Sequence, residues 1–217
     1  MNVIPVINCA DKVCAEKKLA VVKTFLPEGE LLHLDVTDGI FSAHKTWSDP
    51  FAWASLASPF PLEVHLMVEQ PEEHADNWLT AGAKRLVVHI ETITPASLEH
   101  LIVIAESHRG EIMLSSNPET DPEAMTPFID HAAGRINAFQ VLAVHPGAAG
   151  QPFMPSTLQK ISLLRQAMPN AIIEVDGGMN PETVAAVKAA GADTVVSSSY
   201  IFNATDPKLA YQALKNL

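Results

Sequence analysis

The sequence predicts an α/β protein, a closed (β/α)8 or TIM barrel, in a single domain over residues 1–217. Short apolar runs typical of strands alternate with stretches of helical spacing eight times, at roughly equal intervals. The strand segments are almost continuously apolar, as expected for parallel strands covered on both faces. Gly82 and Gly191 stand where two helices must end before a strand. Eight such units in a chain of this length favour a barrel.

The predicted strands are short runs rich in apolar and β-branched residues. In order, they cover residues 3–9, 31–36, 62–68, 85–90, 111–115, 139–144, 171–175 and 194–198. An open, doubly wound sheet is the alternative arrangement of such units. It is disfavoured because no glycine-rich dinucleotide-binding turn follows the first strand.

Each predicted helix follows a strand, and several begin at a proline or at an Asp-Pro or Asn-Pro pair. Proline suits the first helical position because its missing N–H needs no partner there. A long polar loop, residues 37–50, follows the second strand. The helices cover residues 11–25, 51–56, 95–106, 155–167 and 180–190, and further ones begin near Pro71, Asp121 and Asp206.

The composition is that of a globular protein, with 47% hydrophobic and 18% charged residues. The formal net charge of −11 argues against nucleic acid and against anionic membrane surfaces as partners. An anionic substrate would therefore have to be held locally, by backbone amides, helix N-termini or a metal ion.

Two cysteines, Cys9 and Cys14, give no reason to expect a disulfide framework, and they fit a reducing compartment. The N-terminal segment lacks the basic and apolar pattern of a secretory signal. No apolar run reaches the length that crosses a membrane. The expected location is the cytoplasm.

Four metal-competent side chains stand at the carboxyl ends of predicted strands, where barrel enzymes carry out their chemistry. His33 and Asp35 are two residues apart and share one face of the second strand. His65 lies in the third strand and Asp176 follows the seventh. Taken singly, they also fit a solvated turn, a satisfied core histidine and a tight turn. On one rim, two histidines and two carboxylates make a closed ligand set for a divalent metal ion.

Five stretches are weak signals singly but specific in this order and spacing. They are His33-Leu34-Asp35-Val36 with Asp38-Gly39, Val64-His65-Leu66-Met67-Val68, Asn117-Pro118 with Thr120, Pro146-Gly147 with Gly150-Gln151 and Phe153, and Glu174-Val175-Asp176-Gly177-Gly178. Through them the sequence resembles the ribulose-phosphate 3-epimerase family along nearly its whole length. The resemblance implies a barrel of the ribulose-phosphate-binding type, a sugar phosphate as the small-molecule partner, and a homo-oligomer.

The resemblance also implies that His33, Asp35, His65 and Asp176 bind one divalent metal ion, and that Asp35 and Asp176 are the catalytic acid/base pair. Epimerisation beside a carbonyl removes a weakly acidic C–H proton and returns a proton to the opposite face. Two carboxylates can exchange the roles of base and acid in such a reaction. A cation stabilises the developing enediolate charge. Zinc, iron, manganese and cobalt all suit this ligand set.

The phosphate would be held near the ends of the seventh and eighth strands, where barrels commonly bind phosphate. Glycines let backbone amides approach an anion closely. Gly177-Gly178 could instead form a plain tight turn, and residues 197–199 a polar strand end. The expected substrate and phosphate contacts are His65, Gly147, Ala148, Ala149, Gly150, Gly177, Gly178, Ser198 and Ser199.

Several positions depart from the family pattern. Val6 stands where a serine is usual, and Thr37 and Leu142 stand where methionines line the metal site, whereas Met67 is kept. His145 could be a solvated loop residue or a substrate contact, and the pair His44-Lys45 could be a lid contact or part of a charged loop. The other departures are Asn8, Cys9, the loop 39–44, Ala148-Ala149 in place of Phe-Gly, and Ser198 in place of a glycine.

Three functions follow from this pattern. The first is a metal-dependent 3-epimerase of D-ribulose 5-phosphate. The second is a 3-epimerase of another ketose or ketose phosphate, which the altered loop 39–44 and phosphate contacts motivate. The third is a barrel that binds a phosphosugar without turning it over, against which the intact pair Asp35 and Asp176 argues.

Overall fold

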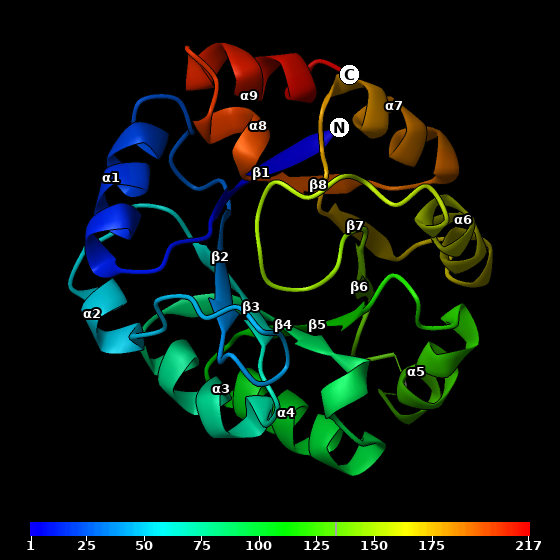
Figure 1. The fold of residues 1–217 in the computed structure, drawn as a ribbon. Coiled ribbons are helices and arrows are strands. Elements are labelled where there is room, and N and C mark those ends of the chain that lie inside the picture. Colours follow the sequence, from blue (N-terminus) through cyan, green and yellow to red (C-terminus); the bar gives the residue numbers. More distant parts are fainter. Residues whose placement is uncertain (133) are drawn as a thin grey trace.

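The computed structural model describes residues 1–132 and 134–217. The strands form a closed parallel barrel in the order β1 to β8, with the helices around its outside (Figure 1). Closure is made by β1, which pairs with both β2 and β8. The predicted (β/α)8 barrel is confirmed, and the open sheet is excluded. The strands are β1 (Asn2–Ile7), β2 (Leu32–Thr37), β3 (Leu62–Met67), β4 (Ala83–His89), β5 (Glu111–Ser116), β6 (Ala138–Leu142), β7 (Ile172–Asp176) and β8 (Thr194–Ser197).

Three of the helices begin at capping residues that the sequence indicates. The side chain of Asp11 accepts the N–H of Cys14, that of Asp206 accepts the N–H of Leu209, and Asn180 caps α7. Among the described residues, none of the helices is both long and apolar enough to cross a membrane. The α-helices are α1 (Lys12–Val22), α2 (Pro50–Ala54), α3 (Pro71–Thr80), α4 (Pro95–Ser107), α5 (Thr126–Ala132), α6 (Thr157–Ala167), α7 (Pro181–Ala190), α8 (Ser199–Phe202) and α9 (Pro207–Lys215), and 3-10 turns lie at η1 (Ile90–Thr92) and η2 (Pro122–Met125).

The predicted strands agree with the observed ones to within two residues at each end, and two of the differences matter for the site. Strand β1 ends at Ile7, so Asn8 and Cys9 belong to the loop that follows it. The carbonyl of Cys9 accepts the N–H of Trp47 at 2.8 Å, which draws this segment toward the loop after β2. At the other end of the chain, β8 ends at Ser197, and Ser199 begins the short helix α8 directly.

Cys9 and Cys14 are joined by a disulfide bond. The sequence alone gives no reason to expect this bond, and in this respect the prediction is wrong. Cys9 follows β1 and Cys14 lies in the first turn of α1, so the turn between the two elements brings their Cα atoms to 5.6 Å, within the normal range for a disulfide. The pairing depends on that turn, which the spacing of the two residues does not encode.

The barrel wall separates an apolar outer layer from a mixed interior, because alternate side chains point to opposite faces of each strand. The outer layer packs against the helices and forms the main hydrophobic core. Inside the barrel, small apolar clusters alternate with fully buried polar groups. These interior polar groups are His33, Glu63, His65, His89, Ser115, Gln140 and Glu174.

Candidate active site

Strands β2, β3 and β7 bring the four predicted metal ligands together at the carboxyl end of the barrel. Asp35 on β2 lies opposite His65 on β3 in the parallel register, and Asp176 is the last residue of β7. His33 precedes Asp35 on the same inward face of β2. One ligand atom from each of the four residues lies within 4.8 Å of the others. These residues, predicted from separate strand ends, therefore form one cluster.

The spacing of these atoms suits a divalent ion. Nε2 of His33 is 3.2 Å and Nδ1 of His65 is 3.5 Å from Oδ1 of Asp35. The same nitrogen of His65 is 3.3 Å from Oδ2 of Asp176. Ligand atoms in a tetrahedral site with bonds of about 2.1 Å lie about 3.4 Å apart.

An unpartnered nitrogen also fits a metal ion. Nδ1 of His65 is buried, and among the described residues it has no hydrogen-bond partner. A buried polar atom left in this way is costly, unless another group binds it. The donor types, their spacing and this nitrogen all fit a divalent cation held by His33, Asp35, His65 and Asp176.

Glu63 on β3 sets the orientation of His33. Its Oε1 lies 2.7 Å from Nδ1 of His33, and its Oε2 accepts a hydrogen bond from Arg85 at 2.9 Å. A carboxylate can only accept, so Nδ1 of His33 carries a proton, and in the neutral, metal-binding form of the ring the lone pair is on Nε2. That lone pair is the one directed toward Asp35. Such carboxylate–histidine pairs commonly hold metal-binding histidines in place.

A hydrogen-bond relay from His65 through His89 to Glu91 sets the orientation of His65, as the contact with Glu63 does for His33. Nε2 of His65 lies 2.8 Å from Nε2 of His89, and Nδ1 of His89 lies 3.2 Å from Oε2 of Glu91. Glu91 also accepts hydrogen bonds from the hydroxyl of Thr120 and the backbone N–H of Asn117. Because Glu91 accepts, His89 donates from Nδ1 and accepts from His65. In the neutral ring of His65, Nδ1 then carries the lone pair, and this nitrogen faces the two carboxylates.

Charge and burial shift the pKa values of two acidic groups in the barrel interior in opposite directions. Burial alone would raise the pKa of Asp35, but the close contacts with the imidazoles of His33 and His65 outweigh it and hold that pKa far below its ordinary range. Burial, together with the charge of Glu63, raises the pKa of Glu174 to about 8. Near neutral pH, Asp35 is therefore an ionised carboxylate, and Glu174 is a neutral group that accepts a hydrogen bond from Gln140.

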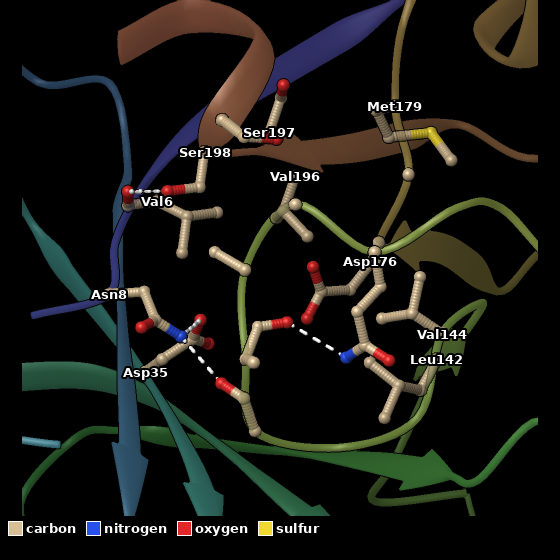
Figure 2. Close-up of a pocket in the computed structure, with 18 of the residues that line it drawn as sticks. Val6, Asn8, Asp35, Leu142, Val144, Asp176, Met179, Val196, Ser197 and Ser198 are labelled. Carbon is tan, nitrogen blue, oxygen red and sulfur yellow. Dashed lines mark hydrogen bonds between the residues drawn. The ribbon is translucent and has the colours of Figure 1, made fainter. Parts of the chain in front are cut away.

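A pocket of about 480 Å³, partly open to solvent, lies at this mouth of the barrel. Asp35 and Asp176 reach it from different sides, on β2 and β7 (Figure 2). His33 and His65 are fully buried and do not line it, so the predicted substrate contact of His65 is not at the pocket wall. The wall does contain the other expected contacts, which are Gly147, Ala148, Ala149, Gly150, Gly177, Gly178, Ser198 and Ser199.

Gly177 and Gly178 are required by packing between two loops. Both have positive φ angles, of 105° and 70°. A Cβ atom on Gly178 would lie 2.6 Å from backbone atoms of Phe153, and one on Gly177 would lie 2.5 Å from the side chain of Val144. These contacts explain the two glycines without any ligand. The same close approach exposes backbone at the pocket wall, where an anion can be bound.

The departures from the family pattern have different surroundings. Val6 and Leu142 line the pocket and make its wall apolar there. Thr37 is fully buried, and its hydroxyl has no partner among the described residues. The hydroxyl of Ser198 donates to the carbonyl of Val6 (Figure 2). Nδ1 of His145 lies 3.1 Å from Glu119, and its side chain is 66% exposed, which favours the solvated loop residue.

Sequence reasoning missed Glu63, His89 and Glu91, and it named Asn8 only as a departure from the family pattern. Glu63 stands two residues before His65, and such polar residues on the inward face of a buried strand are a usable signal. His89 and Glu91 carry the same signal at the end of β4. The sequence carries no signal for the contacts of Asn8, because they are made with residues far away in the chain.

Comparison with known proteins identifies the family of the chain. The model of the ribulose-phosphate 3 epimerase family matches residues 2–202. A ribulose-phosphate 3-epimerase of Mycobacterium leprae is 31% identical over 217 residues, which span 97% of this chain and 92% of that protein. Another, of Chlamydia trachomatis serovar D, is 31% identical over 207 residues, spanning 92% and 85%.

Among solved structures, KGPDC from Streptococcus mutans in complex with D-R5P superposes with a TM-score of 0.75 at 14% identity. The match covers 99% of this chain and 95% of that one, and at this identity it supports the barrel fold alone. The family match and the two relatives go further, since they cover nearly the whole chain. The chain therefore belongs to the ribulose-phosphate 3-epimerase family, whose members are carbohydrate epimerases of the isomerase class.

Proposed function

We propose that this protein is a metal-dependent epimerase that interconverts D-ribulose 5-phosphate and D-xylulose 5-phosphate at C3. The observation that carries the proposal is the meeting of two carboxylates, Asp35 and Asp176, with two buried histidines beside a pocket. Family membership supports the class of reaction. The pocket lies beside both carboxylates, and glycine-rich loops form part of its wall.

In the proposed mechanism, the substrate lies between Asp35 and Asp176 with C3 facing both carboxylates. One carboxylate takes the proton from C3, and the electrons of that C–H bond move into an enediolate. The other, protonated, aspartate gives its proton to the opposite face of C3, which inverts that centre. The two residues exchange roles in the reverse direction, as microscopic reversibility requires.

His33, Asp35, His65 and Asp176 would hold the metal ion, and zinc, iron, manganese and cobalt all suit the donor set. When bound, the cation supplies positive charge where the enediolate oxygens become negative. The buried histidines keep their lone pairs directed at this point through Glu63 and the His89 relay. Val6, Leu142 and Val144 make one side of the pocket wall apolar.

The phosphate would lie among the backbone groups at the ends of β6, β7 and β8. Gly147, Gly150, Gly177 and Gly178 all have positive φ angles, so these loops can turn their amides toward an anion. With a net charge of −11 for the whole chain, local donors are needed to hold a phosphate. Ser198 and Ser199 add hydroxyl groups at the same wall.

Proton exchange in heavy water tests the reaction directly. We expect metal-loaded protein with D-ribulose 5-phosphate to place deuterium at C3 while D-xylulose 5-phosphate appears in the NMR spectrum. Asp176→Asn should abolish both signals and leave the fold intact, because it removes one member of the acid/base pair. Asp206→Asn is the matched control, since asparagine caps α9 as well as aspartate does.

Turnover by Asp176→Asn at the unsubstituted rate would contradict the mechanism.

The replacement of the usual serine by Val6 at the pocket wall favours a second candidate, a 3-epimerase of another ketose or ketose phosphate. A higher kcat/KM for another ketose in a substrate panel would select it. Binding of sugar phosphates without exchange in any of them would select a non-catalytic barrel.

A further inference from the structure

Asn8 is a polar residue of the pocket wall that the mechanism above does not use. It follows β1 directly and is half-buried beside Asp35. It lies two residues after Val6, and both line the pocket. In this chain, the wall contributed by β1 therefore has an apolar side chain at position 6 and an amide at position 8.

The side-chain amide of Asn8 bridges two parts of the site. Its Nδ2 donates one hydrogen bond to Oδ2 of Asp35 at 2.8 Å and another to the backbone carbonyl of Gly147 at 2.9 Å (Figure 2). Both N–H groups of the amide are therefore used, and each joins Asn8 to a different loop or strand. A hydrogen bond to a charged carboxylate is among the stronger kinds in proteins.

The main chain around Asn8 is itself held in place. The carbonyl of Asn8 accepts a hydrogen bond from Nζ of Lys18 at 3.0 Å. The next carbonyl, of Cys9, accepts the N–H of Trp47 at 2.8 Å, and Cys9 is bonded to Cys14 in α1. The amide of Asn8 thus projects from a backbone that is held in place, and it can keep Asp35 and Gly147 in fixed positions.

Because of the hydrogen bond from Asn8, the two oxygens of Asp35 have different partners. Oδ1 faces the metal-competent cluster, 3.2 Å from Nε2 of His33 and 3.5 Å from Nδ1 of His65. Oδ2 faces Asn8. Rotation of the carboxylate would break contacts at both oxygens, so its plane is fixed. A proton-transferring carboxylate gains rate from such fixation, because the reaction requires a defined approach to the C–H bond.

The second contact extends this fixation to the loop after β6. Gly147 has a φ of +116°, and a Cβ atom there would lie 2.7 Å from Oγ of Ser42 and 2.8 Å from Cβ of His44. The loops that follow β1, β2 and β6 therefore meet at Asn8 and Gly147. Because a peptide unit is planar and trans, holding the Gly147 carbonyl also fixes the direction of the Ala148 N–H.

We propose that Asn8 is a positioning residue that orients Asp35 for proton transfer and locks it to the loop that carries Gly147. This inference rests on the proposed epimerase function, since it assigns Asp35 the role given there. It adds a residue that departs from the family pattern and has no part in the ligand set.

Two variants of Asn8 separate positioning from packing. Asn8→Asp keeps the shape of the side chain but replaces the donor by a carboxylate oxygen facing Asp35. Asn8→Ala removes the donor and leaves space. We expect kcat to fall roughly 10- to 100-fold in Asn8→Ala, as for loss of a hydrogen bond to a charged group. We expect a larger fall in Asn8→Asp, with a smaller change of KM in both.

A packing role predicts the opposite order, because Asn8→Asp preserves volume and Asn8→Ala does not. Turnover of Asn8→Asp equal to or above that of Asn8→Ala would therefore overturn the inference. Asn2→Asp is the matched control, the same substitution at the exposed start of the same strand. Circular dichroism establishes that each variant is folded, and if Asn8→Asp does not fold, unchanged turnover in Asn8→Ala overturns the inference.

The visible absorption of Co²⁺-loaded protein gives a readout that needs no turnover. We expect the Co²⁺ bands of Asn8→Ala to shift relative to the unsubstituted protein, because Oδ1 of Asp35 is a proposed ligand. Identical bands would contradict the positioning role. An unsubstituted protein without turnover would contradict the proposed function, and the Co²⁺ spectra would then decide on Asn8 alone.

Discussion

At the residue scale, the chemistry of His33 and His65 depends on two glutamates that do not line the pocket. Glu63 directs a lone pair of His33 toward Asp35, and Glu91 does the same for His65 through His89. Each imidazole is fully buried and has one free nitrogen in the cluster. The proton positions follow from the acceptors at the far ends of the two relays.

We expect Glu63→Gln to weaken binding of Zn²⁺ or Co²⁺ by about 10- to 100-fold, as is usual when a carboxylate behind a histidine ligand is lost. The neutral amide also leaves Arg85 without its buried partner. Isothermal titration measures the change. Glu111→Gln is the matched control, because Glu111 pairs with the same Arg85 but is 67% exposed. Equal affinities in both variants would contradict the role of Glu63.

Glu91 gives a prediction about acid stability. Burial would raise its pKa, but hydrogen bonds from His89, Thr120 and Asn117 outweigh burial and lower the pKa from 4.5 to about 2. A carboxyl whose pKa is lowered on folding stabilises the protein above the unfolded value and loses that contribution as the pH falls. The contribution of Glu91 is thus complete above about pH 4.5 and fades toward pH 2.

We therefore expect Glu91→Gln to lower the free energy of unfolding by roughly 1–3 kcal/mol at pH 7, as for hydrogen bonds to a charged acceptor. The difference from the unsubstituted protein should shrink between pH 4.5 and pH 3. Urea unfolding across this range measures it. Glu119→Gln, which removes an exposed partner of His145, should show little difference at any pH. A difference for Glu91→Gln that is independent of pH would contradict the prediction.

At the element scale, the site is built from loops that leave the barrel at the carboxyl ends of its strands. In Figure 1 the segment between β6 and α6 passes across the mouth of the barrel, where it carries Gly147 and Gly150. The loop after β1 is short and tied to α1 by the disulfide Cys9–Cys14. These connections decide where Asn8 stands relative to Asp35 and Gly147.

Reduction of this disulfide should lower the free energy of unfolding by about 2 kcal/mol, because the bond closes a short loop in the unfolded chain. The two cysteines are separated by five positions. Urea unfolding with and without a thiol reductant measures the difference. Cys14→Ser should be as stable as the reduced protein and indifferent to reductant. A reductant-dependent stability of that variant would contradict the assignment.

At the scale of the whole molecule, the proposed ligands come from β2, β3 and β7, so a bound ion would join opposite parts of the barrel. The net charge of −11 disfavours nucleic acid as a partner, and a sugar phosphate would depend on the local donors at the pocket wall. The homo-oligomer and the cytoplasmic location stay predictions, which light scattering and cell fractionation can test.

Metal ions should therefore stabilise the fold. At a free concentration of 100 times Kd, a ligand that binds only the folded state adds about 2.7 kcal/mol. We expect Co²⁺ to raise the urea midpoint relative to protein treated with a chelator. His65→Asn should lose this shift, since it removes the nitrogen aimed at the cluster. The same midpoint with Co²⁺ and with chelator would contradict a metal site.

The alternation of apolar strands and helices determined the barrel, because each unit buries its own apolar face against its neighbours. It also placed His33, Asp35, His65 and Asp176 at one rim, since parallel strands of a barrel all end on the same side. The order and spacing of the motifs determined the family without reference to any tertiary contact. These features are periodic or local and can be read along the chain.

Only the tertiary structure decided which nitrogen of each histidine is free, that Cys9 bonds Cys14, and that Asn8 holds Asp35. Asn8 is 27 positions from Asp35 and 139 from Gly147. Contacts over such distances depend on strand register and on the shapes of the loops after β1, β2 and β6. No pattern along the sequence encodes them, because each loop adopts its course only when the others are packed against it.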